Sequence, residues 1–200
     1  TSGSFVGAVA TTADRNGVAG GALAFNGALS QYVSVAGGGG LNAASQGTIS
    51  LWVKWTGTQD ADCCGTFGAV LARQSNGLFS DNILALNAAN PTTARIVWKQ
   101  SGASATLITG TAPVGTNWHH IAVTYTYGKP KSIKGFIDGR ETDGDWDIGG
   151  ATDRAPVADG DAVLIGSGST RAATHSFNGW LDDVAIYRGP IDVDALKSRY

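Results

Sequence analysis

The sequence predicts an all-β fold in which two antiparallel sheets pack face to face. Short segments of the chain alternate apolar and polar residues, as strands with one buried face do. Glycine contributes 29 residues, about twice its usual share, as expected where many turns need positive φ. A helical spacing of apolar residues occurs in one stretch, close to the C-terminal end.

The alternation is clearest in two segments. In Leu51–Trp55, Trp52 and Lys54 fall on the face opposite the apolar residues of the segment. His119–Tyr125 alternates in the same way and places His120 on the less apolar face. Both are predicted to be strands with one face in a core.

Further strands follow from the same pattern, and the segments between them are predicted turns. The other predicted strands are Ala69–Gln74, Asn82–Leu86, Ala94–Lys99, Thr106–Thr109, Ser132–Ile137 and Ala162–Gly166. A tight hairpin turn is predicted at Asp138-Gly139. Long connections are expected at 59–68, 87–91 and 142–161. After Pro190, residues 191–197 predict a short helical turn with an early acidic residue, which the helix dipole favours.

Composition restricts the classes of protein that fit. Residues 1–200 contain no Pro- or Ser-rich linker, so we expect one domain with a sizeable core. The net charge of −2 argues against nucleic acid as a partner, which requires clustered Lys and Arg. The sequence contains no run of 18 apolar residues, so it predicts no membrane-spanning helix. The chain begins at Thr1 and contains no Met, so we expect a domain of a longer precursor, secreted or at the cell surface.

The two cysteines, Cys63 and Cys64, are adjacent in the sequence. They cannot cross-link distant strands to each other. A strained vicinal disulfide ring and a pair of free thiols both fit this spacing. A metal site is disfavoured because no other cysteine completes it.

Four segments together indicate a family. They are Gly20–Gly27 with Tyr32–Val35 near the start, Thr48–Trp55 and Asn117–Tyr125 in the middle, and Phe177–Tyr187 near the end. This set resembles the laminin-G-like, concanavalin A-like jelly-roll domains over nearly the whole chain. The resemblance implies a two-sheet antiparallel jelly roll that ends in a short helical turn. Such domains bind sugars, bind proteins or act as spacers, and a smaller group are glycanases.

An enzymatic role is disfavoured by the carboxylates. Glycoside hydrolysis by retention needs two carboxyl groups about 5–5.5 Å apart. The related β-glucanases use a Glu-x-Asp-x-Glu type of run, whereas this chain has a single glutamate, Glu141, with Asp145 where the second should stand. Glu141 also follows the predicted hairpin turn, so a solvated hairpin end is the favoured reading. His119 and His120 are predicted to pack and pair the sheet, and His175 to lie on the surface.

Calcium is the cofactor that the resemblance implies. Asp182 matches the aspartate that binds a structural calcium in the last strand of the related β-glucanases. Its partners would come from the start of the chain, from Asp14, Asn16 and Gly20. Calcium prefers carboxylate, amide and backbone oxygens. The alternative is that Asp182 accepts hydrogen bonds from the N-terminal turn.

Sugar binding needs an aromatic face flanked by polar side chains. Five of the six tryptophans fall in predicted strands, and most are expected in the core. Trp146 is predicted in a loop between Asp145 and Asp147, with Asp143 close by, and is the predicted ligand platform. The acidic residues of this loop could also form a calcium site at the rim. The alternatives are a lid packed on the sandwich and a merely solvated loop.

The sequence therefore favours a non-catalytic, carbohydrate-binding module that is stabilised by calcium. We expect it to be a monomeric domain within a larger secreted or cell-surface protein. The main alternative is an adhesion or spacer module that binds a protein or no ligand. A glycoside hydrolase or polysaccharide lyase is the third reading.

Overall fold

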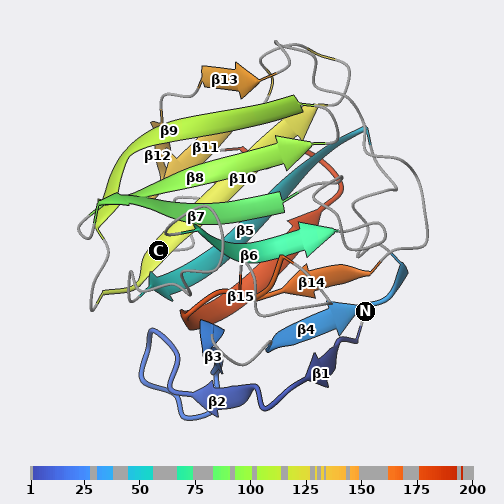
Figure 1. The fold of residues 1–200 in the computed structure, drawn as a ribbon, viewed down its shortest axis with the longest axis vertical. Coiled ribbons are helices and arrows are strands. Elements are labelled where there is room, and N and C mark those ends of the chain that lie inside the picture. The colour runs from blue at the N-terminus through green and yellow to red at the C-terminus, as the bar shows by residue number, and fades with distance from the viewer. Residues whose placement is uncertain are drawn as a thin grey trace.

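Two antiparallel sheets lie face to face and form the whole of the described fold (Figure 1). A computed structural model describes residues 2–27, 31–37, 45–55, 67–73, 83–90, 93–100, 103–113, 117–126, 129, 132, 134–142, 145–148, 162–168, 176–192 and 195. Within these ranges, one sheet has eight strands and the other seven. The predicted all-β jelly-roll sandwich is confirmed. Among the described residues, no helix is long and apolar enough to cross a membrane.

The eight-stranded sheet joins segments that are far apart in the sequence. Its spatial order is β1 (Ser4–Val6), β4 (Tyr32–Val35), β14 (Val163–Ile165), β6 (Phe67–Arg73), β7 (Ile83–Asn90), β8 (Thr93–Gln100), β9 (Ala103–Pro113) and β13 (Asp145–Ile148). Strand β14 pairs with β4 on one side and with β6 on the other. Non-local pairing therefore joins β4 to the run of consecutive strands from β6 to β9.

Most residues of the candidate site lie in the seven-stranded sheet. Its order is β12 (Arg140–Thr142), β11 (Lys134–Ile137), β10 (His119–Thr126), β5 (Gln46–Trp55), β15 (Gly179–Tyr187), β3 (Ala22–Phe25) and β2 (Ala10–Thr12). The long strand β5 is central and pairs with β10 and β15. Strand β3, near the start of the chain, pairs with β15, near its end, so these two segments are neighbours in one sheet.

Most predicted strands exist, with shifted ends, and two predicted connections, 87–91 and 142–161, contain strand residues. The segment 87–91 was expected to be a connection, but β7 continues to Asn90 and pairs with β8. Backbone bonds to β8 supply a reason for an extended conformation that the local sequence does not contain. Cys63 and Cys64 lie outside the described residues, and so does most of the predicted C-terminal helical turn.

The predicted hairpin turn between β11 and β12 is confirmed. Asp138 and Gly139 have φ values of 48° and 72°, as a two-residue hairpin turn with positive φ at both positions requires. The Asp138 carboxylate accepts a hydrogen bond from the backbone N–H of His120 at 2.9 Å. Its second oxygen lies 2.8 Å from Nδ1 of His119. The turn residue thereby ties the hairpin to the start of β10.

The core lies between the sheets, and the seven-stranded sheet has a second, outer face. Alternate residues of β5 and β10 face inward and are almost fully buried, namely Ile49, Leu51, Val53, Ile121 and Val123. Because neighbouring residues of a strand point to opposite faces, Ser50, Trp52 and His120 belong to the outer face. The alternation read from the sequence predicted this division.

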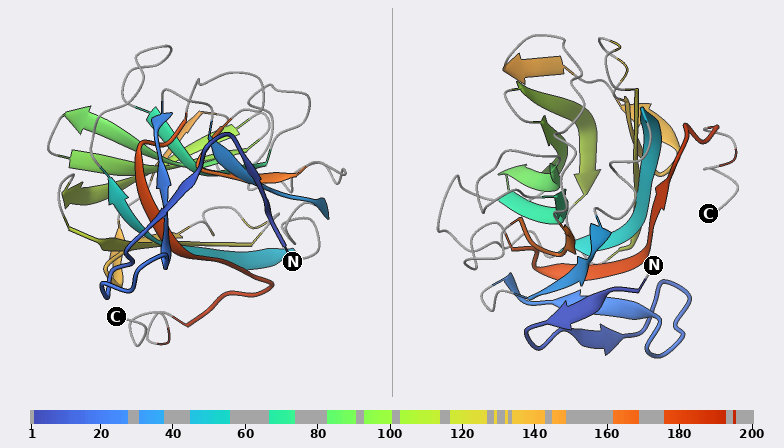
Figure 2. Two further views of the ribbon diagram at one scale, coloured as in Figure 1. Left: turned by 90° about the horizontal axis from the view of Figure 1, so that it is seen from below. Right: turned by 90° about the vertical axis from the view of Figure 1, so that its right-hand side faces the viewer.

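The chain after β15 crosses part of that outer face. Thr48 Oγ1 donates a hydrogen bond to the Gly189 carbonyl and accepts one from the Ile191 N–H, each at 3.0 Å. Ile191 packs against Ala122 and Phe136, both buried. Figure 2 shows this segment on the side of the seven-stranded sheet that faces away from the other sheet.

Candidate functional site

A pocket of about 470 Å³ lies on the outer face of the seven-stranded sheet. It is formed by β5, β10 and β15 and by the loop between β2 and β3. The residues that line it are Arg15, Ser50, Trp52, His120, Asp183, Val184, Ala185 and Tyr187. Aromatic, hydroxyl and charged side chains thus meet in one hollow, which is the composition of a small-molecule site.

Buried polar side chains form the floor of the pocket. His120 lies directly opposite Trp52 in the β10–β5 register. Ser50 Oγ and His120 Nε2 are 2.7 Å apart and share a hydrogen bond, and both residues are buried. The Trp52 and His120 rings meet edge to face with centroids 5.4 Å apart. These contacts fix the floor in one arrangement.

A β-bulge in β15 forms one wall. Asp182 pairs with Trp52, but the next paired residue is Ala185, opposite Ser50, so the register shifts between them. Asp183 lies in this bulge and has a φ of 47°. A bulge adds a residue to one strand and redirects its side chains. Two consecutive carboxylates, Asp182 and Asp183, therefore reach the same partner.

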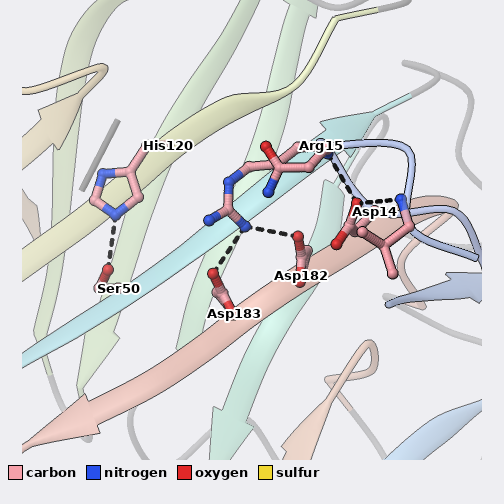
Figure 3. A network of polar contacts seen from close by, with 8 residues as sticks. Asp14, Arg15, Ser50, His120, Asp182 and Asp183 are labelled. Atoms are coloured by element: carbon pink, nitrogen blue, oxygen red, sulfur yellow. Dashed lines mark hydrogen bonds and ion pairs between the residues drawn. The ribbon is translucent and has the colours of Figure 1, made fainter. Parts of the chain in front are cut away.

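That partner is Arg15, from the loop between β2 and β3 (Figure 3). Its Nη1 atom lies 2.8 Å from Oδ2 of Asp182 and 2.7 Å from Oδ2 of Asp183. The Asp182 side chain is 6% exposed and the Asp183 side chain 62%. The Arg15 guanidinium also lies over the Trp52 ring, 4.8 Å from its centroid, in a cation–π contact.

The electrostatics keep Arg15 charged. Burial by itself lowers the pKa of Arg15, and the hydrogen bonds and negative charges of Asp183 and Asp182 outweigh it, so that this pKa is raised. Because the pKa is raised above its unfolded value, the stability linked to protonation of Arg15 is fully present below the unfolded pKa and is lost as the pH rises through the folded pKa. The guanidinium is therefore a permanent cation in the pocket wall.

The loop that carries Arg15 is held by its own polar contacts. Oδ1 of Asp14 accepts hydrogen bonds from the backbone N–H groups of Asn16 and Val18, both at 2.8 Å. Gly17 and Gly20 adopt positive φ values of 82° and 78°. An aspartate that binds the backbone two residues ahead stabilises a turn of this kind. The loop thus presents Arg15 to the sheet in a defined position.

The loop of the predicted metal residues reaches Asp182 through the guanidinium of Arg15. Asp14, Asn16 and Gly20 lie in that loop, and it is Arg15 that contacts Asp182. Hydrogen bonding of Asp182 to the N-terminal turn was the alternative to calcium. Among the described residues, no group of three or more His, Cys, Asp or Glu side chains is placed to hold a metal ion. Calcium stays a prediction.

The predicted ligand platform is a strand rather than a loop. Asp145, Trp146 and Asp147 belong to β13, which pairs with β9 at the edge of the eight-stranded sheet. The loop prediction was wrong because the pairing partner, β9, lies about forty residues earlier in the chain and local composition does not reveal it. Asp143 lies outside the described residues. Binding through these residues stays a prediction.

Glu141 occupies the position that the hairpin predicted. It lies in β12 and forms an ion pair with Lys134 across the hairpin at 2.8 Å, with both side chains 51% exposed. The solvated hairpin end is therefore confirmed for this glutamate.

The pocket itself was not predicted from the sequence. Trp52 was one of five strand tryptophans of which most were expected in the core, His120 was expected in sheet packing, and Arg15 was not predicted as a site residue. One signal was present, because the alternation placed Trp52 on the face opposite the apolar residues of its strand. The missing part was the contact of Arg15 with β15, which joins residues 167 positions apart.

Comparison with known families identifies the class of protein. Residues 26–196 match a laminin-G family described as the concanavalin A-like lectin/glucanases superfamily, and the chain belongs to this family. The comparison with curated proteins finds no match.

Solved structures of the same fold include several domains in complex with sugars. Domain 4 of an extracellular arabinanase from Geobacillus stearothermophilus, in complex with arabinotriose, is 17% identical, with a TM-score of 0.64 over 98% of this chain and 86% of that one. The CBM40 domain of the Ruminococcus gnavus IT-sialidase, bound to α2,3-sialyllactose, is 18% identical, with a TM-score of 0.54 over 77% and 82%. The binding domain of botulinum neurotoxin DC is 11% identical, with a TM-score of 0.65 over 99% of this chain and 45% of that one. At these identities the likeness concerns the fold.

Proposed function

We propose that this domain is a non-catalytic carbohydrate-binding module and that the pocket on the outer face of the seven-stranded sheet holds the sugar. The observation that carries the proposal is the lining of the pocket. Trp52 and Tyr187 provide apolar ring surface, and Arg15, Asp183 and Ser50 provide donors and acceptors for hydroxyl groups. Sugar sites combine an aromatic surface with a few convergent polar groups in this way.

The solved structures of similar fold support this reading. One is a complex with arabinotriose and another with α2,3-sialyllactose. The arabinanase is described as extracellular, which supports a secreted or cell-surface parent protein for this domain. Fold alone does not determine function, so the lining of the pocket remains the main argument.

The placement of Glu141 supports a non-catalytic role. A retaining glycosidase needs a second carboxyl group about 5–5.5 Å from the first, one of them uncharged as an acid. The single glutamate forms an exposed ion pair with Lys134, and Asp182 and Asp183 both contact the cation Arg15. Release of reducing sugar from the glycans tested below would contradict this part of the proposal.

A titration by NMR tests the proposal directly. The isotopically labelled protein is titrated with arabinotriose, lactose and α2,3-sialyllactose, and the indole N–H signals of the tryptophans are followed. We expect at least one sugar to shift the Trp52 signal in a saturable manner. If none of these sugars shifts any pocket signal at millimolar concentration, the adhesion or spacer reading replaces this one.

Two tryptophans of the same sheet provide a matched pair of variants. Trp52 lies under Arg15 at 4.8 Å, and Trp180 lies under Lys54 at 4.9 Å, but Trp180 does not line the pocket. We expect Trp52→Ala to weaken binding about tenfold or more, the equivalent of about 1.4 kcal/mol. Trp180→Ala should leave binding unchanged. Equal losses in both variants would show that the effect comes from the sheet and not from the pocket.

The β13 segment is the second location at which a sugar could bind. Trp146→Ala separates the two, because β13 is at the edge of the other sheet. We expect binding to survive this change. If Trp146→Ala abolishes binding while Trp52→Ala does not, the site lies at Asp143, Asp145, Trp146 and Asp147, as the sequence first suggested.

A further inference from the structure

We infer that the pocket accepts a neutral sugar and discriminates against an acidic one, such as a uronic or sialic acid. This inference rests on the proposed function and specifies its ligand class. Both kinds of sugar occur in the solved structures of similar fold, so the fold does not decide between them. The charges and hydrogen-bonding groups of the pocket do.

The first argument is the balance of charge. Among the described residues that line the pocket, Arg15 is the cation and Asp183 the anion. Asp182, 2.8 Å from Arg15, adds a second negative charge just behind the lining. Two carboxylates against one guanidinium leave one net negative charge at this wall. A ligand carboxylate brought here would meet a field that repels it.

The second argument is the geometry of Arg15. An arginine binds a ligand carboxylate best through two parallel N–H groups. Nη1 of Arg15 already contacts both Asp182 and Asp183, so the two terminal nitrogens cannot together form that fork. Figure 3 shows the other terminal nitrogen directed away from these carboxylates, toward the side where Ser50 and His120 lie. The donors left on Arg15, Nε and the second terminal nitrogen, serve a hydroxyl or ring oxygen as well as a carboxylate, so Arg15 offers an acidic sugar no end-on fork from its two terminal nitrogens.

The third argument is the chemistry of the neighbouring acceptor. The Asp183 carboxylate, 62% exposed, is an acceptor without a hydrogen to donate. A sugar hydroxyl donates and accepts, so adjacent hydroxyls can satisfy Asp183 and Arg15 at the same time. An ionised carboxylate accepts only and would leave Asp183 facing another acceptor. Hydroxyl groups therefore match both Asp183 and Arg15, whereas a carboxylate matches Arg15 alone.

The test compares sugars that differ mainly in the acid. The pairs are methyl galactoside with methyl galacturonoside, and lactose with α2,3-sialyllactose, each titrated at pH 7 and low ionic strength by NMR. We expect the neutral member to bind about tenfold more tightly, a ratio that falls in 1 M salt because the repulsion is screened. An acidic member that binds as tightly as its neutral partner overturns the inference and leaves the proposed function standing. Absence of binding by every sugar overturns both.

A pair of charge variants shows whether Asp183 is the cause. Asp183→Asn removes one negative charge, and asparagine tolerates the positive φ of this position. We expect it to reduce the preference for the neutral sugar at least threefold. Glu141→Gln removes an exposed charge of the same sheet outside the pocket lining and should leave the preference unchanged. An unchanged preference in Asp183→Asn would overturn the assignment of selectivity to this wall.

Discussion

Nη1 of Arg15 lies 2.8 Å from Oδ2 of Asp182, although 167 positions separate the two residues in the sequence. The contact joins the loop between β2 and β3 to the centre of β15. Only 6% of the Asp182 side chain is exposed, so its charge depends on Arg15 for compensation. The same ion pair therefore attaches the N-terminal loop to the sheet and forms part of the pocket wall.

Removing Arg15 should therefore destabilise the fold. Arg15→Ala leaves the Asp182 carboxylate buried without its cation, and we expect a loss of about 2 kcal/mol in the free energy of unfolding. Asp183→Asn removes a 62% exposed partner of the same arginine and should cost about 0.5 kcal/mol. Urea denaturation measures both.

The double variant Arg15→Ala, Asp182→Asn checks the origin of that loss. With the buried charge gone, we expect it to be more stable than Arg15→Ala alone. Strict additivity of the two single changes would show that the residues do not act as a pair.

Calcium and Arg15 compete for the same carboxylate if the predicted calcium staple exists. We expect calcium to raise the melting temperature, and to raise it more in Arg15→Ala than in the unchanged protein, because loss of the guanidinium frees Asp182 and Asp183. A ligand at one hundred times its Kd adds about 2.7 kcal/mol of stability.

The measurement is thermal unfolding in excess chelator and again in excess calcium. Asp182→Ala is the control and should abolish the calcium response. If neither the unchanged protein nor Arg15→Ala responds to calcium, Arg15 alone fulfils the role that the sequence assigned to the ion.

Local patterns predicted the faces of the strands but not the pocket. The alternation at Leu51, Trp52 and Val53 correctly divided core from outer face, because period-two burial is a property of the strand itself. No local pattern predicts the bulge at Asp183, because the sequence does not show which of the two consecutive aspartates pairs with β5 and which is the extra residue. Their convergence on Arg15 arises from pairing between strands at opposite ends of the chain.

The same limit explains the error at β13. Trp146 and Ile148 alternate with aspartates, as in a strand, but the glycines and acids around them are typical of a loop. Pairing with β9 makes this segment a strand, and β9 is distant from it in the sequence. Single-sequence reasoning therefore succeeds where one segment determines its own conformation and fails where a distant partner does.

A glycine beside the core should be intolerant of any side chain. Gly166 has a φ of 87°, and a Cβ atom built there would collide with the Phe25 ring. Gly37 has a similar φ of 71°, but among the described residues no heavy atom lies within 4 Å of such a Cβ. The two glycines thus separate backbone strain from steric collision.

We expect Gly166→Ala to cost about 3 kcal/mol or more, and Gly37→Ala about 1 kcal/mol. Chemical denaturation of both variants gives the comparison. Equal losses would mean that the Phe25 ring moves aside at little cost and that the positive φ alone requires glycine.

Thr48 should control the attachment of the segment that follows β15. Its hydroxyl donates to the Gly189 carbonyl and accepts from the Ile191 N–H, so that Thr48→Val removes both bonds with almost no change in volume. We expect a loss of about 1 kcal/mol, because two partly buried backbone groups lose their partner. The amide of Ile191 should also exchange its hydrogen faster, which hydrogen-exchange NMR detects.

Thr124→Val, at the position paired with Thr48 in the β10–β5 register, is the matched control and should leave Ile191 exchange unchanged. Slow exchange at Ile191 in Thr48→Val would show instead that the packing of Ile191 on Ala122 and Phe136 is sufficient to hold the segment.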